Sequence, residues 1–115
     1  MQLFLQGGEY GQKQYLNKLI IQQYTECQFY ENKNRRGIGF DKPQLEEAGP
    51  TCGCVSMKSF GHTGFTGTIA WADPQEEIVY VFLSNRIYPD PANRKLINKN
   101  VRTKIQQTIY NSLIQ

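Results

Sequence analysis

Two β-forming runs separated by a proline turn constrain the fold of this chain more than any other feature. Residues 64–72 alternate along the chain, which predicts a strand; the side chains on one of its faces are Phe65, Gly67, Ile69 and Trp71. Residues 77–84 are apolar on both faces, which is typical of a central strand covered on both sides. The intervening Asp73-Pro74-Gln75-Glu76 predicts a type I reversal. We therefore expect an antiparallel hairpin within a small sheet.

The N-terminal region predicts two helices. Residues 3–6 form the end of a helix that Gly7-Gly8 terminates, and because so short a helix does not stand alone, we expect the chain to be part of something longer. Residues 8–11 predict a turn. Asn17 predicts the N-cap of a helix over residues 18–26, whose apolar side contains Ile20, Ile21 and Tyr24.

The C-terminal stretch predicts a longer amphipathic helix. Apolar residues recur there at every fourth position, the row that a helix packs against a sheet; they are Ile97, Val101, Ile105, Ile109 and Leu113. Asn98 or Asn100 is suited to cap the start of this helix, and we expect Arg102 and Lys104 to point outward. The fold class expected from these elements is α+β, a small antiparallel sheet with the C-terminal helix packed on one face.

The middle of the chain predicts less regular structure. Residues 36–41 place Gly37 and Gly39 beside two apolar residues, which predicts a strand with close backbone packing. Residues 43–57 lack periodicity and predict a long irregular connection. Connections of that length often carry functional residues.

The cysteine pattern excludes a fully paired disulfide framework. The chain has three cysteines, Cys27, Cys52 and Cys54, so at least one thiol stays free or pairs between chains. Cys52-Gly53-Cys54 together with His62 imitates a zinc ligand set, but structural zinc sites favour about two to four residues between paired cysteines and a second ligand pair. We therefore expect no metal and no cofactor, and the sequence leaves the state of each thiol open.

Size and charge exclude several classes of protein. With 115 residues, of which 39% are hydrophobic, the chain suffices for one small domain. Its apolar runs fall far short of the roughly 20 residues of a membrane-spanning helix, and residues 1–8 show no signal-peptide pattern. The net charge of +3 is typical of a solvated helix face, and since no base-reading motif accompanies it, we expect no nucleic-acid partner.

Residues 60–68 concentrate the groups that suit an active site. This segment, FGHTGFTGT, holds one imidazole, three threonine hydroxyls and three glycines. Glycines let a backbone approach a ligand closely, and strand-edge amides can donate hydrogen bonds to a developing oxyanion. The alternative interpretation is structural, with His62 as a strand-end imidazole bonded to a loop carbonyl.

His62-Thr63-Gly64, followed by the hairpin, resembles the C-terminal third of the serine β-lactamase and penicillin-binding-protein-like hydrolases, the group that includes class C β-lactamases, D-aminopeptidases and related esterases. The resemblance extends over most of the chain from Arg35 onward. It implies that residues 1–115 form a single partial domain, the C-terminal portion of a β-lactamase-like (transpeptidase) domain. It also implies a bacterial protein of the periplasm or cell envelope, with a small-molecule or peptidoglycan-like substrate.

The resemblance assigns a role to each residue of the triplet. His62 takes the place of the lysine in the family's Lys-Thr-Gly and is expected to contact the substrate or a catalytic tyrosine. Thr63 is expected to offer its hydroxyl to a substrate carboxylate or amide, and Gly64 to keep the groove open. The backbone N–H of Phe65 is implied as one of two donors to the oxyanion.

Two of the family's three catalytic elements are absent from the sequence. No serine is followed three residues later by lysine, as the family's Ser-x-x-Lys motif requires; the serines are Ser56, Ser59, Ser84 and Ser112. The Tyr-x-Asn or Tyr-x-Ser pattern has only chance-level matches, at Tyr15-Leu16-Asn17, Tyr30-Glu31-Asn32 and Tyr110-Asn111-Ser112. We therefore predict a C-terminal piece of a serine hydrolase that is inactive alone. The alternative is a non-catalytic interaction or peptidoglycan-binding module.

The resemblance further implies that elements outside this chain cover the sheet. Trp71 and Phe82 are then expected to be partly bare. Since exposed apolar strands tend to pair with other chains, we expect a homodimer through the exposed sheet.

Overall fold

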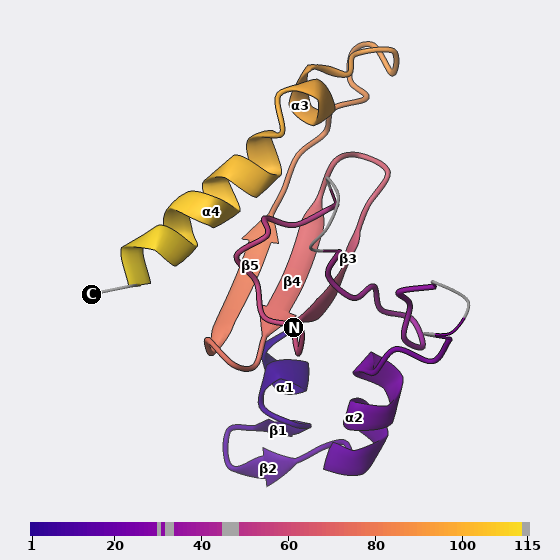
Figure 1. Cartoon of the computed structure of the whole chain (residues 1–115), viewed down its shortest axis with the longest axis vertical. Coiled ribbons are helices and arrows are strands. Elements are labelled where there is room, and N and C mark those ends of the chain that lie inside the picture. Colours follow the sequence, from indigo (N-terminus) through magenta and orange to yellow (C-terminus); the bar gives the residue numbers. More distant parts are fainter. Residues whose placement is uncertain (30, 32–33, 45–48, 114–115) are drawn as a thin grey trace.

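The computed structural model describes residues 1–29, 31, 34–44 and 49–113 (Figure 1). In chain order its elements are α1 (Gln2–Leu5), β1 (Glu9–Tyr10), β2 (Lys13–Gln14), α2 (Lys18–Thr25), β3 (Phe60–Thr63), β4 (Ile69–Asp73), β5 (Ile78–Phe82), α3 (Lys95–Asn98) and α4 (Val101–Leu113). Strands β3, β4 and β5 form an antiparallel sheet, and β1 and β2 form a separate hairpin. The α+β fold class predicted from the sequence is confirmed.

The sheet has β4 at its centre and β3 and β5 at its edges. The turn at residues 74–77 joins β4 to β5, as the proline pattern predicts. The prediction that β5 is a central strand is wrong, since within the described residues it pairs with β4 alone and its Val81 is 52% exposed. The apolar sequence of β5 therefore leaves part of an edge strand in contact with solvent.

The strand predicted over residues 64–72 is interrupted by a turn. The N–H of Gly64 donates to the carbonyl oxygen of Thr68 at 2.9 Å, and the N–H of Gly67 donates to that of Gly64 at 3.0 Å. Gly67 has a φ of +93°, a conformation that glycine adopts without steric cost. The chain thus reverses here, and β4 begins only at Ile69.

The core lies on the sheet face that α4 and the connection before β3 cover. Its buried residues are Cys52, Val55, Ile69, Trp71, Tyr80 and Tyr110. Trp71 is only 1% exposed, so the expectation that it is bare is wrong, whereas Phe82 is partly exposed as expected. Phe65, which the alternation places on the same face, is 75% exposed because it lies in the turn before β4.

α4 runs alongside β5 (Figure 1). The side of α4 that packs against the core is a polar row formed by Arg102, Gln106 and Tyr110. Gln106 and Tyr110 are buried, and Arg102 donates to two backbone carbonyls of the 64–68 turn at 3.1 and 3.2 Å. The prediction that Arg102 points outward is therefore wrong, while Lys104 is exposed as predicted. The predicted apolar row is rotated away from the sheet, which leaves three of its residues exposed: Ile105, Ile109 and Leu113.

Backbone hydrogen bonding explains why the polar row of α4 faces inward. Buried backbone groups need partners, and the N–H of Cys52 finds one in the side-chain oxygen of Gln106 at 3.0 Å. The hydroxyl of Tyr80 on β5 likewise donates to the carbonyl oxygen of Arg102 at 2.9 Å. An apolar residue at position 106 would leave the Cys52 N–H without its acceptor, which costs about 1–3 kcal/mol.

Asp73, at the end of β4, joins three parts of the fold through its buried carboxylate. The carboxylate accepts hydrogen bonds from the Ser56 N–H at 2.8 Å, the Ser56 hydroxyl, the Tyr110 hydroxyl at 2.9 Å and the Gln75 N–H at 3.1 Å. Burial pushes the pKa of Asp73 upward, but these hydrogen bonds outweigh it and hold the pKa below its ordinary value. Burial and the Asp73 carboxylate together raise the pKa of Tyr110.

The N-terminal elements follow their local sequence signals. After α1, the Gly8 N–H donates to the Leu3 carbonyl at 2.8 Å and the Gly7 N–H to the Phe4 carbonyl at 3.2 Å, which confirms the predicted glycine termination. The turn predicted at residues 8–11 is misplaced: β1 occupies positions 9–10, and the reversal falls on Gly11 and Gln12, both with positive φ.

Asn17 caps α2 as predicted, because its side-chain oxygen accepts the N–H of Leu19 at 2.8 Å. Of the three apolar residues expected on one side of this helix, only Ile21 is buried. Ile20 and Tyr24 are about half exposed, at 50% and 46%.

The prediction of a strand over residues 36–41 is wrong. The segment is a tight reversal whose ends, Arg36 and Asp41, pair with each other as an isolated bridge. A Cβ on Gly37 would lie 2.4 Å from the carbonyl oxygen of Tyr24, so the expected close backbone packing holds there. Gly39 instead supplies a φ of +77° at the reversal and faces open space.

The predicted irregular connection of residues 43–57 contains no helix or strand in its described parts, 43–44 and 49–57. It carries a disulfide between Cys52 and Cys54. Cys27 is a free thiol, and its Sγ donates to the carbonyl oxygen of Asn34. This distribution agrees with the odd cysteine count, which leaves at least one thiol unpaired within the chain.

Candidate active-site edge

The candidate site lies along the outer edge of β3, the edge that faces away from β4. Only one position of this edge is paired within the described residues: Asp41 exchanges two backbone hydrogen bonds with Gly61, at 2.7 and 3.1 Å. Strand residues alternate in the direction of their backbone groups, so Thr63, two positions on, presents its N–H and carbonyl to the same outer edge. The edge is therefore closed at Gly61 and open at Thr63.

Asp41 is held in place by two arginines. Its carboxylate is 3.3 Å from Nε of Arg36 and 3.5 Å from an Nη of Arg35, and the residue is 3% exposed. The main chain of Asp41 thereby forms a fixed border next to the triplet. Asp41 was not predicted as part of the site; the signal in the sequence is an acidic residue that closely follows two arginines, but its pairing with β3 is non-local.

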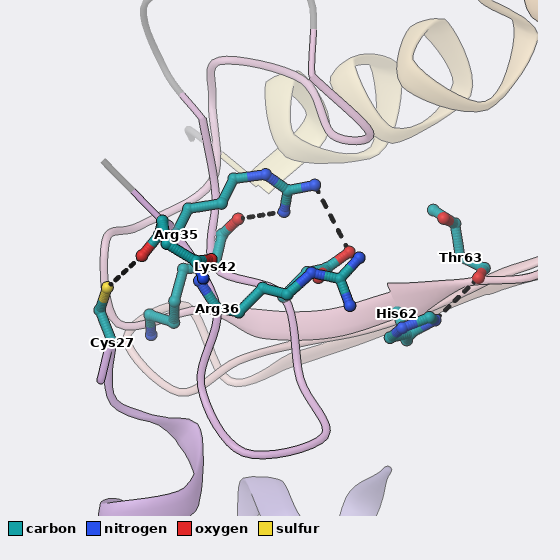
Figure 2. Close-up of polar contacts among 8 residues, drawn as sticks. Cys27, Arg35, Arg36, Lys42, His62 and Thr63 are labelled. Atoms are coloured by element: carbon teal, nitrogen blue, oxygen red, sulfur yellow. Dashed lines mark hydrogen bonds and ion pairs between the residues drawn. The ribbon is translucent and has the colours of Figure 1, made fainter. Parts of the chain in front are cut away.

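His62 lies on β3 opposite Ala70 of β4, with its side chain exposed. Its Nδ1 is 2.8 Å from the carbonyl oxygen of Thr63 (Figure 2). Because a carbonyl only accepts hydrogen bonds, Nδ1 carries the proton in this contact, and a neutral ring then has its lone pair on Nε2. Nε2 makes no hydrogen bond with the described part of the chain and is available to accept one from a ligand.

Thr63 and Gly64 occupy the end of β3 and the start of the turn. The side chain of Thr63 is partly exposed, on the sheet face opposite that of His62. A Cβ on Gly64 would lie 2.2 Å from the hydroxyl of Thr68, so this position has no room for a side chain as the turn stands.

Phe65 follows with an exposed side chain and an unused amide. Its ring lies 5.0 Å from the guanidinium carbon of Arg86, a cation–π contact at the surface. Within the described residues its backbone N–H donates no hydrogen bond. The structure thus brings His62, Thr63, Gly64 and Phe65 together as one open corner of the sheet, with a free imidazole nitrogen and a free amide.

The sequence holds no Ser-x-x-Lys motif. Of its formal Tyr-x-Asn matches, the one at Tyr30 and Asn32 falls outside the described residues.

The described residues form no cluster of three or more potential metal ligands. None of their helices has the length and apolarity that would carry it across a bilayer. A cavity of about 890 Å³ bordered by the described residues lies elsewhere, between α1 and α2.

Comparison with known proteins gives a consistent result. A sequence model of the family described as Beta-lactamase matches residues 2–101. Proteins named "Putative D-alanyl-D-alanine carboxypeptidase" from Salmonella enteritidis PT4, Salmonella typhi and Salmonella newport are each 33% identical to this chain over 102 residues. The match covers 88% of this chain and 23% of each relative, so the chain spans about a quarter of their length. From the extent of the family match, this chain belongs to the beta-lactamase family.

Proposed function

We propose that this chain forms the β3 wall of a β-lactamase-type acyl-transfer site and that a polypeptide segment outside these 115 residues supplies the nucleophile. The observation that carries the proposal is the open outer edge of β3 at Thr63, next to the unbonded N–H of Phe65. Substrates are peptides or esters of the peptidoglycan type, as the name of the Salmonella relatives suggests. This function places the protein in the periplasm or cell envelope.

Each residue of the corner has a defined task in this proposal. An extended substrate lies along the open edge and accepts a hydrogen bond from the backbone N–H of Thr63, while the Thr63 hydroxyl binds its carboxylate or amide. The N–H of Phe65 donates to the oxygen of the attacked carbonyl as negative charge develops there, a contact worth roughly 3 kcal/mol of the barrier. Nε2 of His62 accepts a hydrogen bond from the substrate or from a tyrosine hydroxyl.

The chain alone is expected to show no hydrolysis, because an oxyanion donor and an imidazole do not replace an attacking group. The measurement is turnover of nitrocefin and of p-nitrophenyl butyrate by the 115-residue chain, compared with the His62→Ala variant. Equal rates, both at the buffer background, are the expected result. Turnover by the unmodified chain above that of His62→Ala would contradict the predicted inactivity.

The same site is tested in a longer protein in which this chain is joined to a family segment that carries a Ser-x-x-Lys motif. Acylation by a fluorescent penicillin is expected there. His62→Ala should slow this acylation by about 10²-fold, which is the usual effect of removing one positioned acid–base group. Gly53→Ala is the matched control, because a Cβ there meets no atom within 4 Å. Binding of peptidoglycan fragments with no acylation would instead support a non-catalytic binding module.

We also propose that the chain forms a homodimer through the outer edge of β5. No charged residue or proline protects this strand, and the next residue, Leu83, is 78% exposed. Size-exclusion chromatography with light scattering is expected to give a dimer, and Val81→Lys is expected to shift it to monomer because a lysine opposes edge pairing. A monomer at high concentration in the unmodified chain would rule out this pairing.

A further inference from the structure

A cavity of about 890 Å³ lies between α1, α2 and the chain segments that flank β3 and follow β4. In Figure 1 these elements gather at the end of the sheet away from α3. The cavity does not include the triplet, and its size falls within the usual range of small-molecule pockets. Nothing in the proposed acyl-transfer role uses it.

The inner wall of the cavity is apolar and well supported. Its apolar side chains include Phe4, Leu5, Ile21, Pro43, Met57 and Phe60. The rings of Phe4, Phe40 and Phe60 contact one another edge to face, with centroids 5.3 and 5.2 Å apart. Ile21 and Phe60 are almost completely buried, at 6% and 2% exposure. Such a wall favours an unbranched or flat apolar group.

The charges around the cavity are unbalanced. Among the described residues that line it, the carboxylate of Glu26 faces four cationic side chains: Lys18, Arg35, Lys42 and Lys58. Glu26 already accepts a hydrogen bond from Gln22 at 2.7 Å, and Arg35 is engaged with Asp41. The cavity therefore complements an anionic ligand.

Lys42 is the cation placed to receive that charge. Its ammonium donates to the carbonyl oxygen of Lys58 at 3.2 Å and lies 6.0 Å from the centre of the Phe60 ring, but it forms no ion pair within the described residues. Burial lowers the pKa of Lys42, against the opposing influence of Cys27, Glu26 and Asp73. A partly buried ammonium without a carboxylate partner gains more from an incoming anion than a fully solvated one does.

From this geometry we propose that the cavity is a binding site for a single-chain carboxylate amphiphile, a fatty acid. The carboxylate pairs with the ammonium of Lys42, and the acyl chain lies against Phe4, Ile21 and Phe60. This site is separate from the acyl-transfer corner, and the two proposals stand or fall independently.

The test is a titration of the ¹⁵N-labelled 115-residue chain with decanoate and, separately, with decan-1-ol, followed by amide chemical shifts. Decanoate is expected to saturate and to bind about tenfold more tightly than the alcohol, the contribution of one charge-assisted hydrogen bond. The amides that move should be those lining the cavity, such as Ile21, Lys42 and Phe60. Lys42→Met should remove the preference for decanoate, whereas Lys104→Met, on the exposed surface of α4, should retain it.

Three results would overturn the proposal. The first is a lack of saturation with decanoate, and the second is equal affinity of the unmodified chain for the acid and the alcohol. The third is a set of shifts centred on the exposed apolar row of α4, since that row also attracts amphiphiles. The comparison of the two ligands on the unmodified chain decides the matter even if Lys42→Met fails to fold.

Discussion

Replacing Asp73 by alanine is expected to lower the free energy of unfolding by roughly 3 kcal/mol or more. Asp73 is 1% exposed, and its removal leaves the hydroxyl of Tyr110 and the N–H of Ser56 without their acceptor. Each buried polar group left without a partner costs about 1–3 kcal/mol. A domain of this size has a total stability of only about 5–15 kcal/mol, so the variant is expected to be largely destabilised.

Urea denaturation followed by the fluorescence of Trp71, the single tryptophan, measures this effect. Glu76→Ala is the matched control, because Glu76 is an exposed carboxylate in the turn that follows Asp73. Asp73→Asn keeps one acceptor oxygen and should fall between the two. A loss of stability in Asp73→Ala no larger than in Glu76→Ala would show that the carboxylate does not join β4 to α4.

The same carboxylate predicts how stability depends on pH. Since the pKa of Asp73 is lower in the folded state than its ordinary value near 4, folding favours the ionised form. Its contribution is therefore fully present above the unfolded pKa and is lost as the pH falls through the folded pKa. The unfolding free energy of the unmodified chain should decline below about pH 4, and Asp73→Asn should reduce that slope.

The parts of the fold that local sequence determines were predictable. The cap at Asn17, the termination at Gly7-Gly8 and the turn at residues 74–77 each depend on groups a few residues apart. At the candidate corner from His62 to Phe65, the local pattern placed Phe65 in a strand rather than in the turn where it lies. Alternation does not reveal the turn at residues 64–68, because every second residue is apolar or glycine in the turn as well as in the strand that follows it.

The errors arose where distant segments meet. The inward face of α4 depends on hydrogen bonds from the N–H of Cys52 to Gln106 and from Arg102 to the 64–68 turn, and these contacts outweigh the apolar row in the helix sequence. The edge position of β5 and the pairing of Asp41 with Gly61 depend in the same way on sheet order. A single sequence carries no record of such partners, so the border of the candidate site was not predictable.

Gly61→Ala is expected to disrupt the candidate site and to cost roughly 3 kcal/mol, the upper part of the usual range for overpacking. A Cβ on Gly61 would lie 2.3 Å from the carbonyl oxygen of Ala70, and 2.5 and 2.7 Å from two atoms of Trp71. Backbone and a buried indole cannot both move aside, because β4 is paired on both edges and Trp71 is 1% exposed. β3 must therefore shift away from β4.

Such a shift couples stability to the proposed function, since His62 is the next residue along β3. The expected result of Gly61→Ala is a lower urea midpoint in this chain, together with amide shift changes from Asp41 to Phe65 and slower penicillin acylation in the longer protein. Gly53→Ala, whose Cβ meets open space, is the matched control and should leave all three measurements unchanged. If Gly61→Ala matched that control in stability while still slowing acylation, the glycine would be needed for substrate approach and not for the β3–β4 contact.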